Sequence, residues 1–170
     1  TPPHLGTADP FYGVWGGSAS DVFAVGSDGT ILHYNGSTWT SLFSGTTNNL
    51  SGVWGGSASD VFAVGSDGLI LHYSGSAWTA MNSGTTNLLT CVWGTSGNDV
   101  FAVGINGTVL HYNGSAWTAM TSSTTNDLHG VWGGSASDVF AVGAYGTILH
   151  YNGRAWATMS SGTTNHLYGV

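Results

Sequence analysis

The chain has 170 residues and very few charges: 5% of residues are charged, Arg154 is the only basic residue, and eight acidic residues give a net charge of −7. Recognition of nucleic-acid phosphates needs clustered lysine and arginine, so that function class is excluded, and docking on an anionic membrane surface is disfavoured. Hydrophobic residues make up 41% and aromatic residues 12% of the chain, which is enough for a packed core, and valine, threonine and aromatic side chains favour an all-β fold.

An internal repeat organises the chain. Val14-Trp15-Gly16 returns with a period of 39 residues at Val53, Val92 and Val131, and residues 11–49 and 50–88 are identical at 30 of 39 positions. The period divides the chain into the end of a preceding repeat, four complete units and the first strand of a further repeat. The predicted ranges are 1–10, 11–49, 50–88, 89–127, 128–166 and 167–170.

Each unit is predicted to contain four short strands. Glycine with serine, aspartate or asparagine marks the turns between them, and a Gly-Thr-Thr-Asn stretch links one unit to the next. In the second unit the expected strands are Leu50–Gly55, Asp60–Gly65, Leu69–Tyr73 and Trp78–Ser83. Their apolar residues alternate poorly, as in Val61-Phe62-Ala63-Val64, which is typical of a sheet covered on both faces. Tandem units of four antiparallel strands predict a β-propeller with one blade per repeat, in preference to a β-solenoid, whose coils are shorter.

The repeat resembles a known kind of propeller. Val-Trp-Gly, Ser-Asp-Val-Phe-Ala-Val-Gly and Gly-Thr-Ile-Leu-His-Tyr-Asn-Gly, followed by Trp, look like the propeller repeats of secreted bacterial proteins of the sialidase-like (BNR) type. The near-identical units also resemble tandem-repeat propeller lectins such as tachylectin and fungal fucose lectins, and engineered symmetric propellers. The resemblance implies a secreted, extracellular β-propeller, although the strict Asp-box Ser-x-Asp-x-Gly-x-x-Trp is absent.

The partial repeats bear on assembly. A closed ring of four blades has no place for both Phe11–Val14 and Leu167–Val170, which occupy the same place in the repeat. Two hypotheses follow: the chain is a section of a longer array, or blades are completed between chains, so that the protein self-associates through its terminal strands.

The positions that differ between repeats are expected on one rim of the propeller, where the links and the turns between second and third strands lie. Three sets of equivalent positions vary there. The sets are Tyr12, Ser51, Thr90 and His129; Asp28, Asp67, Asn106 and Tyr145; and Asn49, Leu88, Asp127 and His166. Loops on a rigid scaffold carry recognition, so this rim is a candidate binding face, and free drift of loop tips is the alternative.

Repeated aromatic residues supply the other candidate site. The tryptophan that opens each fourth strand is expected to pack between blades or, alternatively, to stack on sugar rings together with the tyrosine that ends the third strand. The candidate ligand-binding residues are Trp39, Trp78, Trp117, Trp156, Tyr34, Tyr73, Tyr112, Tyr151, Asp28, Asp67, Asn106 and Tyr145.

No catalytic or metal-ligating pattern emerges. His33 and its repeats are expected to make a hydrogen bond within each blade, and Asp21 and its repeats to fix the preceding turn through backbone N–H groups. Glutamate is absent and Arg154 stands alone, so paired-acid or sialidase chemistry is disfavoured. Cys91 occupies a place held by glycine in other repeats, which indicates a small buried residue. No cofactor is expected.

Two functions are therefore considered. The first is a non-enzymatic, multivalent carbohydrate-binding propeller with one weak site per blade, as in a lectin. The alternative is a structural or self-assembling propeller-repeat protein, natural or engineered, that has no ligand and completes its blades between chains.

Overall fold

The computed structural model of the protein describes residues 10–170, which form four sheets of four strands and four short 3₁₀ turns. The strands are β1 (Phe11–Ser18), β2 (Asp21–Gly26), β3 (Ile31–Tyr34), β4 (Trp39–Leu42), β5 (Leu50–Ser57), β6 (Asp60–Gly65), β7 (Ile70–Tyr73), β8 (Trp78–Met81), β9 (Leu89–Ser96), β10 (Asp99–Gly104), β11 (Val109–Tyr112), β12 (Trp117–Ala119), β13 (Leu128–Ser135), β14 (Asp138–Gly143), β15 (Ile148–Tyr151) and β16 (Trp156–Met159). The turns are η1 (Ser27–Gly29), η2 (Ser66–Gly68), η3 (Ile105–Gly107) and η4 (Ala144–Gly146).

Each sheet is an antiparallel meander, and we number the sheets blades 1 to 4 in chain order. The first strand of each blade is longer than predicted. In blade 2 it continues to Ser57, because a bulge after Gly55 lets Ser57 pair with Asp60 across a tight turn. The third strand begins one residue later than predicted, at Ile70, and the fourth ends at Met81.

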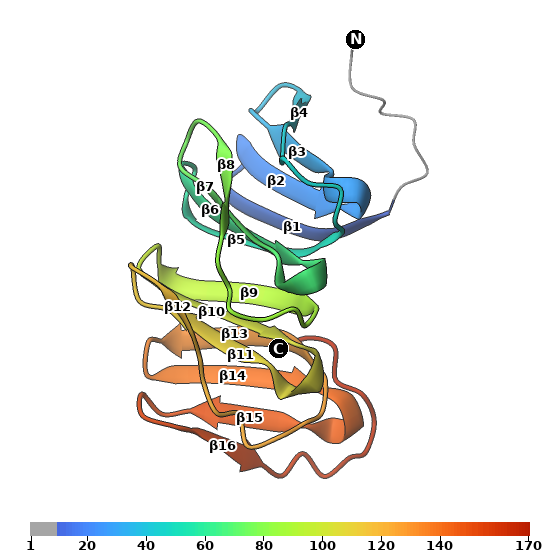
Figure 1. The fold of residues 1–170 in the computed structure, drawn as a ribbon, viewed down its shortest axis with the longest axis vertical. Coiled ribbons are helices and arrows are strands. Elements are labelled where there is room, and N and C mark those ends of the chain that lie inside the picture. Colours follow the sequence, from blue (N-terminus) through green and yellow to red (C-terminus); the bar gives the residue numbers. More distant parts are fainter. Residues whose placement is uncertain (1–9) are drawn as a thin grey trace.

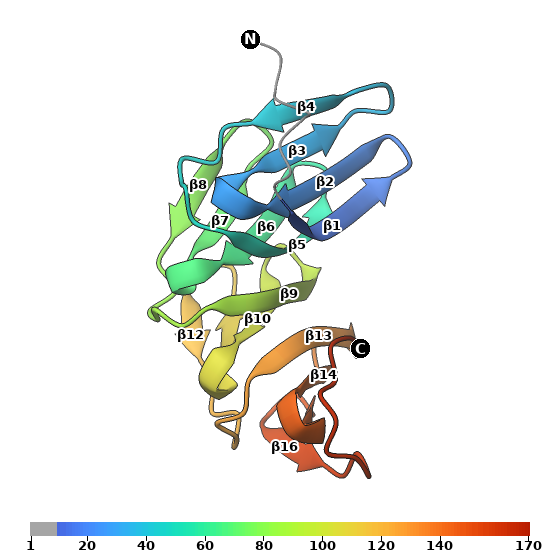
Figure 2. The same cartoon turned by 90° about the vertical axis from the view of Figure 1, so that its right-hand side faces the viewer.

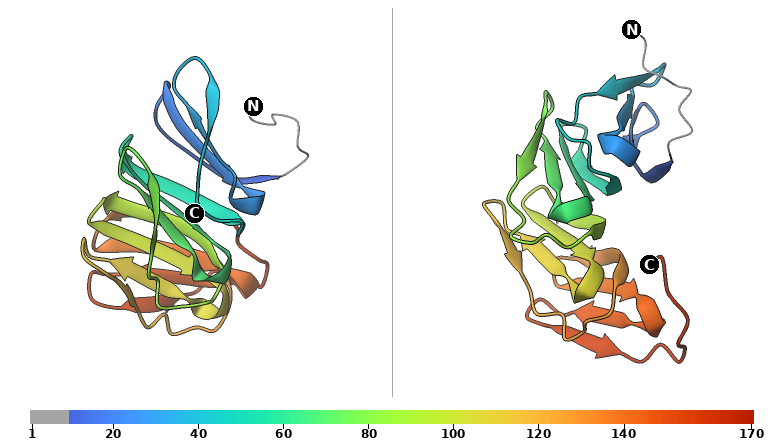
Figure 3. Two further views of the ribbon diagram at one scale, coloured as in Figure 1. Left: turned by 45° about the horizontal axis from the view of Figure 1, so that its top comes forward. Right: turned by 45° about the vertical axis from the view of Figure 1, so that its right-hand side comes forward.

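The blades stand side by side in an open arc, with blades 1 and 4 at its two ends (Figures 1 and 2). The first strands β1, β5, β9 and β13 are neighbours along the inner side of the arc. Their backbones approach closely: a Cβ at Gly52 would lie 3.2 Å from the Cα of Cys91. The inner positions therefore hold glycine or a small residue, as expected for Cys91. Figure 3 shows the arc from two further directions.

Among residues 10–170 the core consists of three apolar clusters, and each joins two successive blades. Between blades 1 and 2 the fully buried Phe23 and Val25 pack with Val53, Val61 and Trp78. Equivalent clusters join blade 2 to blade 3 and blade 3 to blade 4. Because the inner blades are covered on both sides, their central strands are apolar on both faces, which confirms the propeller architecture predicted from the repeat.

The predictions for the two ends of the chain have different outcomes from those for the four blades. Residues 1–9, predicted as the end of a preceding repeat, lie outside the described residues. Residues 167–170, predicted as a first strand, form no strand. The Leu167 N–H donates to the Gly143 carbonyl at 3.0 Å, but no second strand pairs with this segment. Among residues 10–170, no helix has the length and apolarity needed to cross a membrane.

Candidate functional site

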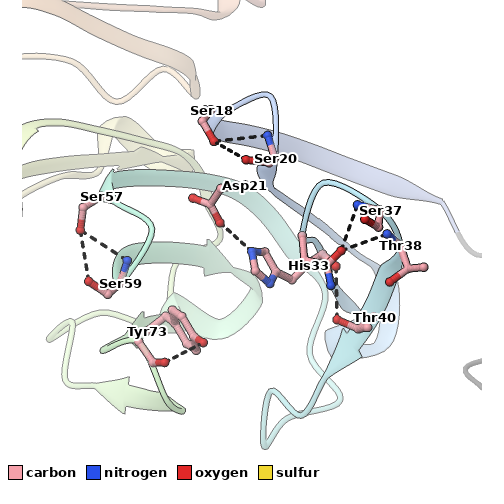
Figure 4. A network of polar contacts seen from close by, with 12 residues as sticks. Ser18, Ser20, Asp21, His33, Ser37, Thr38, Thr40, Ser57, Ser59 and Tyr73 are labelled. Carbon is pink, nitrogen blue, oxygen red and sulfur yellow. Dashed lines mark hydrogen bonds and ion pairs between the residues drawn. The ribbon is translucent and has the colours of Figure 1, made fainter.

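A histidine–aspartate pair recurs in every blade and has a structural role. The imidazole of His33 lies 2.6 Å from Asp21 and stacks on Phe23 with a centroid distance of 4.4 Å. Figure 4 shows this pair between strands β2 and β3. The equivalent pairs His72–Asp60, His111–Asp99 and His150–Asp138 have distances of 2.7, 2.7 and 2.8 Å. The predicted hydrogen bond within each blade is confirmed.

The aspartate has a different partner from the one predicted. Asp21 and its equivalents accept a hydrogen bond from the histidine of the third strand, and serine hydroxyls take the predicted role in the turn. The Ser18 hydroxyl accepts from the Ser20 N–H, and the Ser57 hydroxyl accepts from the Ser59 N–H (Figure 4). These acids are therefore committed to blade stability.

The four candidate tryptophans of the fourth strands do not form exposed platforms. Trp78, Trp117 and Trp156 are buried, and each meets a phenylalanine of the preceding blade edge-on. Their indole N–H groups have no hydrogen-bond partner among the described residues, so they contribute apolar packing. Trp39 is 37% exposed because it lies on the face of blade 1 that points away from blade 2, at the end of the arc. Three of the four rings therefore pack between blades, as first expected for this set. Because these three rings are buried, they are not available for stacking on sugars.

The candidate tyrosines belong to the same packing. Tyr73 lies 5.6 Å from Phe23 of the preceding blade and 5.3 Å from Trp78 of its own blade, between ring centroids. Its hydroxyl donates to the Gly75 carbonyl at 3.0 Å. Tyr112 and Tyr151 repeat the ring contacts, whereas Tyr34 contacts Trp39 within blade 1. This set therefore lines the blade interfaces.

The positions that vary between repeats do lie together, on the edge of the arc that carries the 3₁₀ turns and the links between blades (Figure 1). We call this edge the variable rim. Each 3₁₀ turn is tied to the preceding link by a backbone bond, as from the Ala144 N–H to the Asp127 carbonyl at 2.8 Å. The middle residue of each turn has a left-handed backbone. These residues are Asp28, Asp67, Asn106 and Tyr145, with φ between 51° and 56°.

In blades 1 and 3 the link side chain caps the turn. The Asp28 N–H donates to the Asn49 side chain at 3.1 Å, and the Asn106 N–H donates to Asp127 at 2.9 Å. Leu88 and His166 occupy the corresponding position in blades 2 and 4, and neither makes such a bond. Polar side chains on the rim of blades 1 and 3 are thus partly used to hold the turn.

At blade 4 the three variable sets meet in one hollow of about 340 Å³. Its lining includes Asp127, His129, Tyr145, His166 and Tyr168, together with Thr125, Asn126 and Ala144. The His129 and Tyr168 rings stack with centroids 5.0 Å apart and planes at 23°, and Tyr145 and His166 lie 5.1 Å apart. Within residues 10–170, no side-chain hydrogen bond engages either imidazole or either phenol of this cluster. The hollow thus combines aromatic faces with donors and acceptors that are available to a ligand.

Tyr145, His129 and His166 were predicted on this rim, but not as parts of one site, and Tyr168 was not predicted as a site residue. The 39-residue period would have identified Tyr168, because it lies 39 residues after His129 and is therefore its equivalent in the next unit.

The described part of the chain contains no group of three histidine, cysteine, aspartate or glutamate residues that could hold a metal ion. Burial raises the pKa of the Cys91 thiol, which keeps it in the unreactive protonated form.

Comparison with known proteins gives the fold. The sequence matches no family model and no curated protein. Among solved structures, YCF48 from Cyanidioschyzon merolae matches with a TM-score of 0.72 at 15% identity, over 97% of this chain and 60% of that one. A structure described as YCF48 bound to D1 peptide matches with a TM-score of 0.42 at 12% identity, over 88% of this chain and 66% of that one. The chain therefore has the β-propeller fold and spans about 60% of the length of the first of these structures.

Proposed function

We propose that the protein is a non-enzymatic binding propeller that recognises carbohydrate through its variable rim. The hollow at blade 4 carries this proposal, because the positions that differ between otherwise near-identical repeats come together there. Loops held by a rigid scaffold are where proteins place recognition. The scaffold is rigid in this sense: the turns and links of the rim are fixed by backbone hydrogen bonds.

The chemistry of the hollow suits a sugar. Sugar rings present C–H groups to aromatic faces and hydroxyl groups to polar atoms, and small-molecule sites combine apolar walls with a few convergent polar groups. His129, Tyr145, His166 and Tyr168 offer ring faces, and their nitrogen and oxygen atoms can donate or accept. We therefore assign the binding role to these rim residues, and no longer to the tryptophans.

A glycan-array screen of the purified chain tests this function. We expect binding to a defined family of sugars, and its loss in a variant that carries the blade 2 residues at the rim of blade 4: His129→Ser, Tyr145→Asp and His166→Leu. Each new residue already stands at the equivalent position of a folded blade, so the variant should fold.

The matched control is Arg154→Ser, which installs the serine of the other repeats in the turn between the third and fourth strands, away from the variable rim. It should bind as the parent does. If the folded parent chain bound no glycan on the array, the proposal would be refuted.

Uncovered blade faces favour a second function, self-association. Val14 of blade 1 is 69% exposed, whereas its equivalents Val53, Val92 and Val131 are buried by the preceding blade. At the other end of the arc, Trp132 is 48% exposed. We propose that the exposed face of blade 1 packs on a second copy of the chain.

The native mass of the 170-residue chain tests self-association. Light scattering should give a mass that is a multiple of 17.4 kDa and falls toward 17.4 kDa on dilution. Val14→Lys should lower the mass in the same way, because it places a charge in the interface between copies. The control Arg154→Ser should assemble as the parent does. A mass of 17.4 kDa at every concentration would refute self-association and leave the carbohydrate proposal unaffected.

A further inference from the structure

We infer that the chain binds one neutral saccharide unit, at the blade 4 hollow alone, and not at four equivalent sites. This inference rests on the proposed carbohydrate-binding function and specifies its stoichiometry and ligand class. It departs from the multivalent arrangement predicted from the repeat, in which every blade carries a similar site.

Four rings gather on the rim at blade 4, whereas the equivalent positions hold one ring in blade 1, Tyr12, and one in blade 3, His129. The positions of Asp127, His129, Tyr145, His166 and Tyr168 are occupied in blade 2 by Asn49, Ser51, Asp67, Leu88 and Thr90. Blade 2 therefore offers no aromatic face at these five positions. The hydroxyl of Thr90 is also engaged there, since it donates to the Val103 and Leu128 carbonyls.

The backbone of Tyr145 is a second sign that blade 4 is specialised. Its φ of 56° is a left-handed conformation that a bulky residue rarely adopts, and the other blades place aspartate or asparagine there. The ring is 66% exposed, so burial in a core does not explain the tyrosine. A residue held in an unfavourable conformation with its side chain presented to solvent indicates a role in contact with a ligand.

The size of the hollow sets the size of the ligand. Its volume of about 340 Å³ lies at the small end of the range for small-molecule sites, which begins near roughly 300 Å³. The stacked His129–Tyr168 pair and the Tyr145–His166 pair are joined through His129 and His166, whose centroids lie 6.3 Å apart. This arrangement suits one sugar ring against the aromatic walls, with any further units of a glycan in solvent.

The charge at the hollow sets the class of sugar. Asp127 contributes a carboxylate, of which Oδ1 accepts the Asn106 N–H and Oδ2 makes no hydrogen bond within the described residues. The chain has a net charge of −7, and its only basic residue, Arg154, lies in a turn away from the variable rim. A uronic or sialic acid would bring a like charge toward Asp127 without a lysine or arginine to balance it. The site is therefore specific for neutral sugars.

Calorimetric titration of the intact chain tests the inference. The ligands are methyl glycosides of neutral hexoses and N-acetylhexosamines, with glucuronic and sialic acid glycosides as the charged comparison. We expect one site per chain for a neutral glycoside and at least tenfold weaker binding of the acids. Tyr145→Asp should weaken neutral-sugar binding at least tenfold. Tyr145→Phe, which keeps the ring face, should retain most of the affinity.

The matched control is the reverse change in blade 2, Asp67→Tyr. One tyrosine without the surrounding rings should leave both affinity and stoichiometry unchanged. Two or more equal sites, full binding by Tyr145→Asp, or preferred binding of acids would overturn this inference while the carbohydrate function stands. Absence of binding to every glycan would refute the function itself, and this inference with it.

Discussion

At the residue scale, Tyr145 illustrates a conflict between stability and the proposed binding role. A left-handed backbone costs an L-residue roughly 1–2 kcal/mol, and asparagine and aspartate tolerate it best because their short side chains bond locally. Asp28, Asp67 and Asn106 occupy the equivalent turns, whereas Tyr145 adopts the same φ with a bulky ring. We therefore attribute the tyrosine to the proposed binding role.

Tyr145→Asn should accordingly make the protein more stable and less able to bind. We expect the free energy of unfolding to rise by about 0.5–1 kcal/mol, somewhat less than the backbone cost, because the contact of the ring with His166 is lost. Urea denaturation followed by tryptophan fluorescence measures this change. Asp67→Asn, which exchanges two residues that both tolerate the turn, should leave the midpoint unchanged. A lower midpoint for Tyr145→Asn would contradict the assignment of strain.

At the scale of strands and turns, the 39-residue period was sufficient to predict the four-stranded units and the turns between them. It did not predict the ends of the strands. Ser57 extends β5 because a bulge shifts the register, and register depends on contacts across the hairpin that a linear pattern does not contain. The Asp21–His33 pair was missed for a similar reason: each residue was interpreted with its sequence neighbours, whereas β2 and β3 bring them together. The blade 4 site requires the same three-dimensional information.

Successive blades also fit together through glycines that no strand propensity explains. The ring of Trp93 in blade 3 lies against Gly133 of blade 4, where an added Cβ would be 2.7 Å from the indole and 2.7 Å from the Asp138 carbonyl oxygen. Gly133→Ala should therefore force the two blades apart and cost about 1–3 kcal/mol of stability, as overpacking does elsewhere. Denaturant unfolding measures the loss. The neighbouring Gly134→Ala is the control, because its nearest atom would lie at an ordinary 3.4 Å. Equal effects of the two substitutions would refute this account of the joint.

At the scale of the whole molecule, stability is distributed over the joints between blades. The three apolar clusters of the core all lie between successive blades, so each inner blade depends on its two neighbours. Repeat proteins of this kind have stabilities close to a sum over units and nearest-neighbour interfaces. Because the units share one period, any two blades can in principle form the same joint.

Removal of one complete repeat should consequently leave a folded protein. Deletion of residues 50–88 takes 39 of 170 residues and joins blade 1 to blade 3, so that Trp117 meets Phe23 in place of Phe62. We expect a cooperative unfolding transition with an m-value lower by about a quarter, in proportion to the surface lost, and a lower free energy of unfolding because one interface is gone. Since blade 4 and its rim are untouched, sugar binding should persist with one site per chain. A deletion of residues 50–81, which breaks the period, is the control and should not fold. If the in-register deletion failed to fold as well, the blades would not be interchangeable, and the stability of the arc would depend on contacts specific to blade 2.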